Sequence, residues 1–410
     1  MINTIVYKKF SVITKKYNNF YKISYHDFYQ YILKKTQFTK NTSFFFIKNL
    51  ILITLSLYTI IKFFLFKKNI KANYFIIKKK DKNFIDERSC FYVKKTDLKS
   101  KLNFIKSENF KESLIIFFSY PNIIYIYSFK YFINFFIRIK KKDNFYKKVH
   151  KQNYLFYLVL KKIFLILRVK EIHLIDDYRI VPLILSICNE LKISSVGYMH
   201  GRISKYNIIH KYFTFNKIYV WSNYFRNKLI KINYNYKHSS KIIINKFIKF
   251  SPRLLNKFKK KKNYTKINLL YVLDAVSDPN LIINSLKKIK KYKKINLYIK
   301  FRPNENVNKA LIDFCLNNNI NFFYKEDIYK VCLAHRINFI ISSYSTVLVE
   351  CSLFGIYPLM LVNKDDDLLN ELILDKVVVP IYSFNNFYKK ILKLQSSKNI
   401  LKNIKQKVWQ

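Results

Sequence analysis

The chain has 410 residues, 50% of them hydrophobic, and a formal net charge of +53 from 77 basic and 24 acidic residues. This length suits two domains, and the hydrophobic content excludes a disordered chain. The charge favours contact with anionic lipid, nucleic acid or phosphorylated substrates. Lysine is nevertheless spread along the whole chain, which also fits a drift of the coding sequence towards A/T-rich codons that raises lysine everywhere.

Glycine is scarce and cysteine is scattered. The chain has three glycines, Gly197, Gly201 and Gly355, where average usage predicts roughly 29. A glycine that remains in such a composition indicates a place where a side chain does not fit. The five cysteines have no CxxC spacing, so they predict neither a disulfide framework nor a zinc site and fit a reducing cytoplasm. No secretory signal is evident at the N-terminus.

The first predicted element is the apolar stretch Phe44–Phe66, within an N-terminal segment of residues 1–72. Lys48 and Lys62 bracket thirteen uncharged residues, fewer than the ~18–20 that cross a bilayer cleanly. Both lysines could snorkel and lengthen the span, and basic residues follow from Lys67 to Lys80. The stretch predicts a helix that is buried in the first domain, lies on a membrane surface or crosses the membrane.

Residues 73–246 predict a first α/β domain. Short, continuous, β-branched runs are typical of strands buried on both faces, and they occur at Leu114–Ser119, Glu171–Asp176, Ser194–Met199, Lys217–Ser222 and Lys241–Asn245. Val181–Lys192 and Asn223–Ile232 are expected to be helices. Residues 247–266 contain Pro252 and a lysine run, a composition that predicts a linker.

Residues 267–385 alternate more regularly and predict a second domain. Strands are expected at Ile267–Val272, Ile295–Phe301, Ile320–Tyr324, Ile337–Ser342 and Tyr357–Val362, with helices at Leu281–Lys291, Val307–Asn317, Asp327–His335 and Thr346–Phe354. Residues 386–410 are expected to form a C-terminal helix. The alternation implies parallel sheets covered by helices. The predicted fold is therefore α/β, with two Rossmann-like domains and an interdomain cleft, and with ligands at the carboxyl ends of the strands.

The first candidate site follows the strand at Ser194–Met199. His200 emerges there, and it could accept a proton, contact a phosphate or be structural. Gly197 lies inside the strand, where glycine usually marks a close approach of backbone. Gly201 could let the chain turn sharply or let a ligand approach.

Asp176 and Asp177 end the preceding strand. If the two strands are neighbours, these carboxylates lie beside His200. One of them could be a general base or could orient the histidine. Capping of a helix is the alternative role.

The second candidate site is the loop after the strand at Ile337–Ser342. It carries four hydroxyls, from Ser342, Ser343, Ser345 and Thr346. A helix is expected to begin there, and a helix N-terminus favours a phosphate group as ligand. The alternative is that the hydroxyls only cap the helix, which would use one of the four. Glu350 could accept hydrogen bonds from ribose hydroxyls or be a solvated charge. Gly355 stands where the helix must stop, a left-handed position that suits glycine.

Lys300 and Arg302 follow the second strand of the same domain and are expected to leave it on the same side. A guanidinium offers a fork for two phosphate oxygens, although a charged loop tip is the alternative. The acidic run Asp365–Asp367 is interpreted as a solvated loop, so no metal site is expected.

Together these motifs resemble bacterial glycosyltransferases of the GT-B fold that build capsule or other surface polysaccharides. A first-domain strand of that family commonly ends in Gln-His-Gly, and here it reads Met199-His200-Gly201. The second domain commonly carries Lys-x-His-Pro-x-Glu, which runs here from Lys300 to Glu305 with Arg302 in place of histidine. A Ser-Ser/Ser-Thr loop followed by Glu, Gly and Pro is matched by Ser342, Ser343, Ser345, Thr346, Glu350, Gly355 and Pro358. The resemblance covers about Glu171 to Asn363.

The resemblance implies transfer of a sugar from a nucleotide-activated donor, held by the second domain, to a growing surface polysaccharide or glycolipid, held by the first. Arg302 leaves open whether the branch is sialyltransferase-like or glycerophosphotransferase-like. A polyol-phosphate transferase of the same fold is one alternative, and a non-catalytic basic protein bound to membrane or nucleic acid is another. We further expect no metal or other cofactor, no nucleic-acid partner, and a cytoplasmic location at the acidic inner face of the cell membrane.

Overall fold

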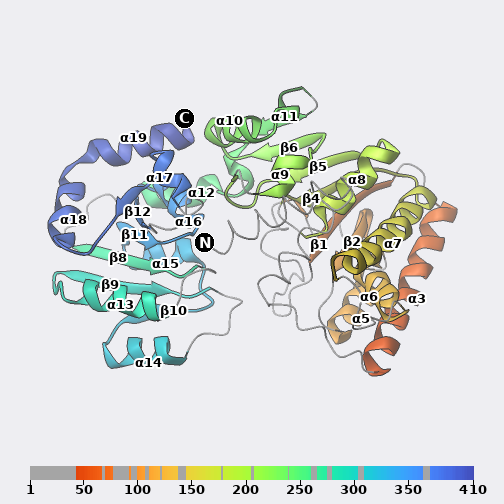
Figure 1. Ribbon diagram of the computed structural model, residues 1–410, viewed down its shortest axis with the longest axis horizontal. Coiled ribbons are helices and arrows are strands. Elements are labelled where there is room, and N and C mark those ends of the chain that lie inside the picture. Colours follow the sequence, from red (N-terminus) through yellow and green to blue (C-terminus); the bar gives the residue numbers. More distant parts are fainter. Residues whose placement is uncertain are drawn as a thin grey trace. The chain divides into compact units, whose positions relative to one another are not determined.

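The computed structural model describes residues 43–66, 70–76, 92–93, 99–106, 110–120, 122–136, 145–176, 179–204, 207–238, 240–259, 266–274, 279–302, 309–362 and 370–410. The chain forms two compact units (Figure 1). The N-terminal unit extends to Ile248, and the C-terminal unit comprises Lys249–Gln410 together with Ser222–Phe225.

The N-terminal unit is built on a seven-stranded parallel sheet in the order β3-β2-β1-β4-β5-β6-β7. Its strands are β1 (Ile70–Ile76), β2 (Leu102–Lys106), β3 (Ile123–Tyr125), β4 (Val169–Ile175), β5 (Ser194–Tyr198), β6 (Lys217–Val220) and β7 (Lys241–Ile244). The chain first moves outward from β1 to β3 and then crosses back to β4 beside β1. This is the doubly wound Rossmann order, extended by one strand.

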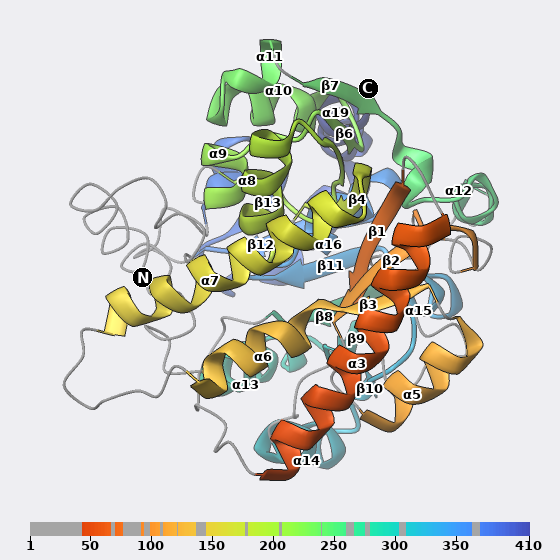
Figure 2. The same ribbon diagram turned by 90° about the vertical axis from the view of Figure 1, so that its right-hand side faces the viewer.

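The helices of this region are α3 (Ser43–Phe66), α5 (Phe110–Ser119), α6 (Ile126–Phe136), α7 (Phe145–Ile166), α8 (Val181–Leu191), α9 (Ile208–Tyr212), α10 (Asn223–Ile232) and α11 (Asn235–His238). Figure 2 shows α3 beside α5 and α6 at the β3 end of the sheet. Leu52 of α3 joins a buried cluster with Ile116 and Phe117 of α5, above strands β2 and β3. One side of α3 is therefore part of the domain core.

The segment Leu114–Ser119 is helical and belongs to α5, so its prediction as a strand is wrong. Ile116 and Phe117 point into the core, whereas Ile115 and Phe118 are exposed. A short apolar run does not by itself distinguish a strand from part of a helix.

The C-terminal unit is built on a six-stranded parallel sheet in the order β10-β9-β8-β11-β12-β13. Its strands are β8 (Ile267–Val272), β9 (Ile295–Lys300), β10 (Asn321–Phe323), β11 (Phe339–Ser342), β12 (Tyr357–Leu361) and β13 (Val379–Ile381). The order is again that of a Rossmann sheet. The predicted α/β class, with two Rossmann-like domains and parallel sheets, is confirmed.

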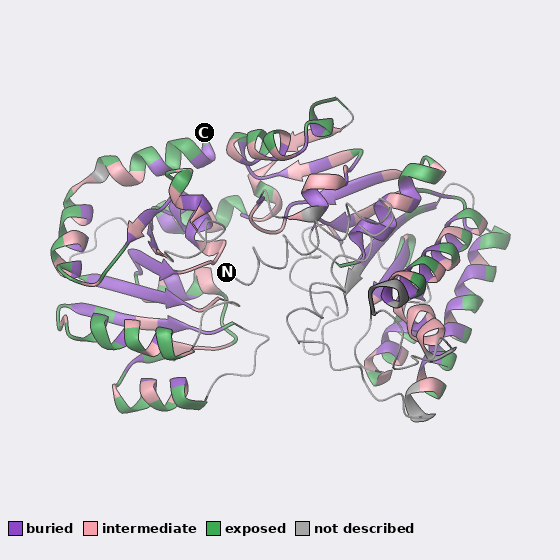
Figure 3. Cartoon of the chain, in the orientation of Figure 1, coloured by how far each residue is buried: buried purple, intermediate pink, exposed green. Residues whose placement is uncertain are grey.

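The helices of the C-terminal unit are α12 (Pro252–Lys259), α13 (Pro279–Lys290), α14 (Lys309–Asn317), α15 (Ile328–Ala334), α16 (Val347–Leu353), α17 (Glu371–Leu374), α18 (Phe387–Ser396) and α19 (Lys398–Trp409). The segment expected as a linker thus holds α12. The region expected as one C-terminal helix forms two, because the backbone of Ser397 is not helical (φ −93°, ψ 84°). Figure 3 shows that the strands of each sheet are mostly buried, as expected of sheets covered by helices.

Candidate functional site

The carboxyl edge of the C-terminal sheet has a defined reversal point. Ligands of doubly wound sheets bind where the strand order reverses, and here that point lies between β8 and β11. Two short segments leave the sheet at this point: Leu273–Asp274 after β8 and Ser343–Thr346 after β11. The second is the hydroxyl-rich loop identified in the sequence.

Asp274 fixes the loop that follows β11. Its Oδ2 accepts a hydrogen bond from the Tyr344 N–H at 3.1 Å, and the Ser342 hydroxyl donates to the same oxygen at 3.4 Å. The two partners lie about 70 residues further along the chain, so sequence reasoning missed this carboxylate. The available signal is a polar residue placed two positions after the wholly buried strand β8.

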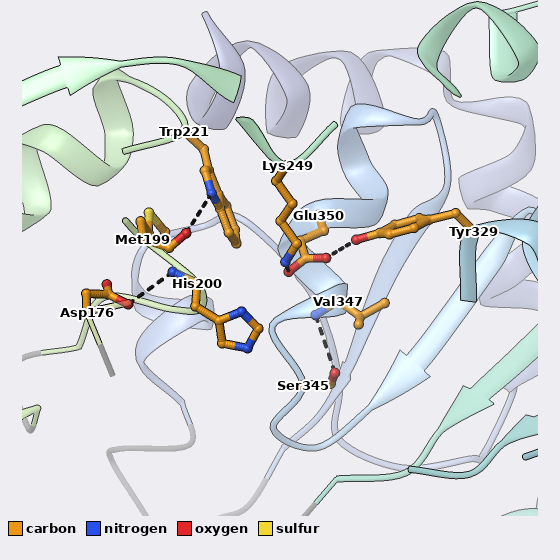
Figure 4. Close-up of polar contacts among 9 residues, drawn as sticks. All are labelled: Asp176, Met199, His200, Trp221, Lys249, Tyr329, Ser345, Val347 and Glu350. Atoms are coloured by element: carbon orange, nitrogen blue, oxygen red, sulfur yellow. Dashed lines mark hydrogen bonds and ion pairs between the residues drawn. The ribbon is translucent and has the colours of Figure 1, made fainter. Parts of the chain in front are cut away.

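The four hydroxyls of the loop differ in burial and in hydrogen bonding, so they do not all have the same role. Ser342 is fully buried in β11. Ser345 Oγ accepts from the Val347 N–H at 3.3 Å and so makes the local cap of α16 (Figure 4), whereas Thr346, the N-cap residue, makes no side-chain cap bond. Within the described part of the chain, the half-buried hydroxyls of Ser343 and Thr346 make no hydrogen bond. These two are therefore the hydroxyls that a ligand can reach.

Glu350 is buried, with 3% of its surface exposed, so its interpretation as a solvated charge is wrong. Its Oε1 accepts from Lys249 Nζ at 2.5 Å, and its Oε2 accepts from the Tyr329 hydroxyl (Figure 4). Burial raises the pKa of Tyr329 well above its usual range, and the Glu350 charge adds to the effect. Glu350 thus joins α16 to α15 and to the segment before α12.

Lys300 and Arg302 do not leave β9 together, contrary to the prediction. Lys300 is buried, and its ammonium group donates to the carbonyls of Phe301 at 2.7 Å and Tyr324 at 3.0 Å. It stabilises the ends of β9 and β10. Arg302 is exposed just beyond the strand. Pro303, Asn304 and Glu305 lie outside the described residues.

Gly355 ends α16 with a φ of +79°, the left-handed conformation that L side chains rarely adopt. An added Cβ would meet no atom within 4 Å. Backbone conformation, and not space, therefore requires glycine at this position.

In the N-terminal unit, Asp176 lies just beyond β4 and is 1% exposed. Its Oδ1 accepts from the His200 N–H at 3.0 Å (Figure 4), and its Oδ2 pairs with His210 Nε2 at 3.1 Å. Asp176 thus holds the exit of β5 through the backbone of His200, whose side chain is half-buried. Asp177 lies outside the described residues.

Sequence reasoning missed His210, which is 1% exposed on α9. Because the Asp176 carboxylate accepts from Nε2, that nitrogen carries the proton. Nδ1 is buried and has no hydrogen-bond partner in the described chain. The only sequence signal is a second histidine ten residues after His200.

Gly197 lies on β5 directly under the ring of Phe215. A Cβ at this position would lie 2.8 Å from two atoms of that ring, closer than real side chains pack. Next along the chain, the carbonyl of Met199 accepts from Trp221 Nε1 at 3.1 Å (Figure 4). Gly201 forms the bend after His200, and its φ is not in the left-handed region.

No group of three or more histidine, cysteine, aspartate or glutamate side chains is placed to hold a metal ion in the described part of the chain. Asp365–Asp367 lie outside that part. An open hollow of about 490 Å³ lies at the end of β10 and along α15; it is lined by Phe323, Lys325, Glu326, Asp327, Lys330, Val331, Ala334 and His335. It contains none of the predicted site residues.

No family model matches the chain, and no curated protein matches it. Among solved structures, the chain is similar to Staphylococcus aureus MnaA in complex with UDP, with a TM-score of 0.47 and 11% identity over 83% of this chain and 92% of that one. It is also similar to a UDP-GlcNAc 2-epimerase from Neisseria meningitidis bound to UDP-GlcNAc (TM-score 0.48, 13% identity, 82% and 94% covered). A glycosyltransferase from Rickettsia africae ESF-5 gives a TM-score of 0.42 at 13% identity, with 83% and 94% covered. Structural similarities this weak do not assign an activity to this chain. The fold assignment therefore rests on the strand orders of the two sheets.

Proposed function

We propose that the protein is a glycosyltransferase that moves a sugar from a nucleotide-activated donor to a growing surface polysaccharide or glycolipid. The observation that carries the proposal is the loop Ser343–Thr346, anchored by Asp274 at the reversal point of the C-terminal sheet. Rossmann sheets bind phosphorylated ligands at this edge. The acceptor class follows from the family that the motifs resemble.

In this proposal the C-terminal unit binds the nucleotide. The Ser343 and Thr346 hydroxyls donate to phosphate oxygens, and exposed Arg302 offers a charged fork to the same group. Negative charge develops on the leaving nucleotide as the bond to the sugar breaks. Donors that are already in place stabilise that charge in the transition state.

The N-terminal unit supplies the base in this proposal. The His200 imidazole accepts the proton of the acceptor hydroxyl as that oxygen attacks the sugar. Asp176 acts as a positioning residue, because both of its oxygens are engaged and it is almost completely buried. It holds the backbone of His200, and no metal or other cofactor takes part.

Isothermal calorimetry with UDP, CDP, GDP and CDP-glycerol tests the donor site. We expect one nucleotide to bind wild type, and the double variant Arg302→Ala, Ser343→Ala to bind it roughly tenfold or more weakly, the worth of two polar contacts. The control is Arg253→Ala, Ser396→Ala, which removes the same two side-chain types from exposed positions of the same unit. If both doubles bind as well as wild type, the site is misassigned. Turnover of CDP-glycerol alone would instead support the polyol-phosphate transferase.

A further inference from the structure

Helix α3 has an unusual surface for a helix packed on a sheet. It is apolar on its outer side as well as its inner side, and it is the helix, within the described residues, that is long and apolar enough to cross a membrane (Phe46–Phe66, mean hydropathy 1.9). A helix that is hydrophobic all round normally has apolar surroundings on every side. Here the described residues cover only one side of the helix.

The inner side is integrated into the N-terminal unit. Leu52, Ser56 and Phe63 are all at most 3% exposed. The Ser56 hydroxyl oxygen accepts from the Tyr125 N–H of β3 at 2.9 Å. A bilayer-spanning position would strip these contacts and expose the edge of the sheet, so the structure argues against a span.

The outer side is an apolar stripe, which we call the α3 face; exposed Thr54 interrupts it near the middle, and its hydroxyl donates to the Leu50 carbonyl at 3.1 Å. Its members recur at helical spacing and are 39–62% exposed: Ile47, Leu50, Ile51, Leu57, Tyr58, Ile61, Phe64 and Leu65. The face continues onto α5, because Tyr58 contacts the ring of Phe117, which contacts that of Phe118, 77% exposed. Figure 3 shows the exposed outer side of α3 along its length.

Lysines border the α3 face at both ends. The Lys48 ammonium group lies over the ring of Phe110, and the next residue after Phe110 is exposed Lys111. Near the other end, Lys62 donates to the side chain of Asn122 at 3.4 Å, and that side chain in turn donates to the carbonyl of exposed Lys99. Helix α3 contains no acidic residue, and α5 contains one, half-buried Glu112.

We propose that the α3 face docks the N-terminal unit on the surface of an anionic bilayer, with α3 lying along the membrane plane. Apolar side chains then enter the boundary between headgroups and acyl chains, and the bordering lysines contact anionic lipids. A second copy of the chain is a poorer occupant, since each copy carries a formal charge of +53 and like charges repel. The inner face of the cell membrane has the required charge. This inference does not depend on the proposed transferase activity.

Co-sedimentation of the full chain with phosphatidylcholine vesicles, with and without phosphatidylglycerol, tests the docking. We expect binding to the anionic vesicles, weakened by salt. The triple variant Leu57→Gln, Ile61→Gln, Leu65→Gln should partition at least roughly tenfold less, because exposed apolar side chains drive the insertion. The matched control Leu281→Gln, Leu316→Gln, Leu374→Gln changes three leucines of the C-terminal unit that are 59–70% exposed, and should bind like wild type.

Four results would overturn the proposal. Equal binding of both triple variants, or no binding by wild type, removes the α3 face from any membrane contact. Membrane-bound protein that alkaline carbonate cannot release, and only detergent can, indicates a true span. A lipid-free dimer in light scattering that the α3 triple variant converts to a monomer assigns the face to a second copy. Circular dichroism of both variants establishes that each is folded.

Discussion

The two sheets end in the same arrangement, a carboxylate after one strand that accepts a hydrogen bond from the backbone following its neighbour. Asp176 accepts from the His200 N–H at 3.0 Å in the N-terminal unit, and Asp274 accepts from the Tyr344 N–H at 3.1 Å in the C-terminal unit. Asp176 is buried and its other oxygen pairs with His210, whereas Asp274 is half-buried beside a loop with reachable hydroxyls. The same carboxylate-to-backbone hydrogen bond thus holds a buried strand end, the sealed end, in the N-terminal unit and a half-buried loop, the open loop, in the C-terminal unit.

The largest effect that this comparison predicts is on turnover. If the sealed strand end exists to present His200 as the base, His200→Ala should cut turnover by roughly 10²–10⁴-fold. Nucleotide affinity should stay the same, because the nucleotide is assigned to the open loop of the other unit. Transfer of a radiolabelled sugar to a polymer extract from the source organism measures the first quantity, and calorimetry measures the second.

A different outcome would move the base to a neighbouring residue. Full activity of His200→Ala together with an inactive Asp176→Asn or Asp177→Asn would make an aspartate the base. A His200→Ala protein that loses turnover, nucleotide affinity and melting temperature together would show a structural histidine.

The second prediction compares the two anchors directly. Asp176→Ala leaves the His200 N–H and His210 Nε2 buried without their acceptor, which should cost about 3 kcal/mol of unfolding free energy. Asp274 is half-buried, so water can replace it at the Tyr344 N–H, and Asp274→Ala should cost only about 1 kcal/mol. Urea unfolding can follow each unit by its own tryptophan, Trp221 or Trp409, when the other is changed to phenylalanine. Equal losses in the two units would contradict the distinction between sealed and open ends.

Most of the C-terminal sheet was predictable because its apolar runs alternate regularly with helix-like segments, although Asn268 and Asn296 interrupt β8 and β9, and β13 was missed. β8 occupies Ile267–Val272, as predicted. The other four strands predicted for this sheet are present, and each of their ends lies within two residues of its predicted position. In the first third of the chain, β1, β2 and β3 were missed. Asn73 and Asn103 interrupt the apolar pattern of β1 and β2, yet both are fully buried, because the Asn73 amide donates to the Asn103 side-chain oxygen at 3.3 Å. Such pairing depends on strands 30 residues apart, which periodicity does not reveal.

The candidate site was only partly predictable for the same reason. The positions of His200 and the hydroxyl loop at strand ends follow from the alternation of strands and helices. The partners that define their roles do not: Asp274 acts on the loop after the neighbouring strand, His210 reaches Asp176 from α9, and Lys249 reaches Glu350 over 101 residues. Lys300 looked like a ligand because of its charge, and only the fold reveals that its ammonium group is used by two carbonyls.

A third, smaller effect compares one glycine in each unit. Gly197→Ala places a Cβ against the buried ring of Phe215 and should cost about 2 kcal/mol through overpacking. Gly355→Ala has free space but a positive φ, and should cost about 1 kcal/mol through backbone strain. Adding Phe215→Leu should recover part of the loss for Gly197→Ala and none for Gly355→Ala. Chemical unfolding of the four variants measures this, and rescue of both glycine variants would contradict the assigned causes.

The smallest predicted effect concerns acid, and it again separates the two units. In the N-terminal sheet, His173 Nδ1 lies 2.9 Å from the Tyr198 hydroxyl and its Nε2 lies 3.0 Å from Glu171. Burial lowers the pKa of His173 below its usual 6.5, although Glu171 opposes the shift. Burial also lowers the pKa of His150 in the same unit.

Since the unfolded chain binds these protons first as the pH falls, the stability contributed by neutral His173 and His150 is complete above pH 6.5 and is lost below it. Burial raises the pKa of Glu171, but His173 and Lys71 outweigh burial and hold it below 4.5, so the contribution of Glu171 is lost only at lower pH. The melting temperature reported by Trp221 should therefore fall as the pH drops below 6.5, and His173→Gln should flatten that fall. An unchanged profile in His173→Gln would contradict the assignment. An equal fall reported by Trp409 would mean that acid sensitivity does not distinguish the sealed unit from the open one.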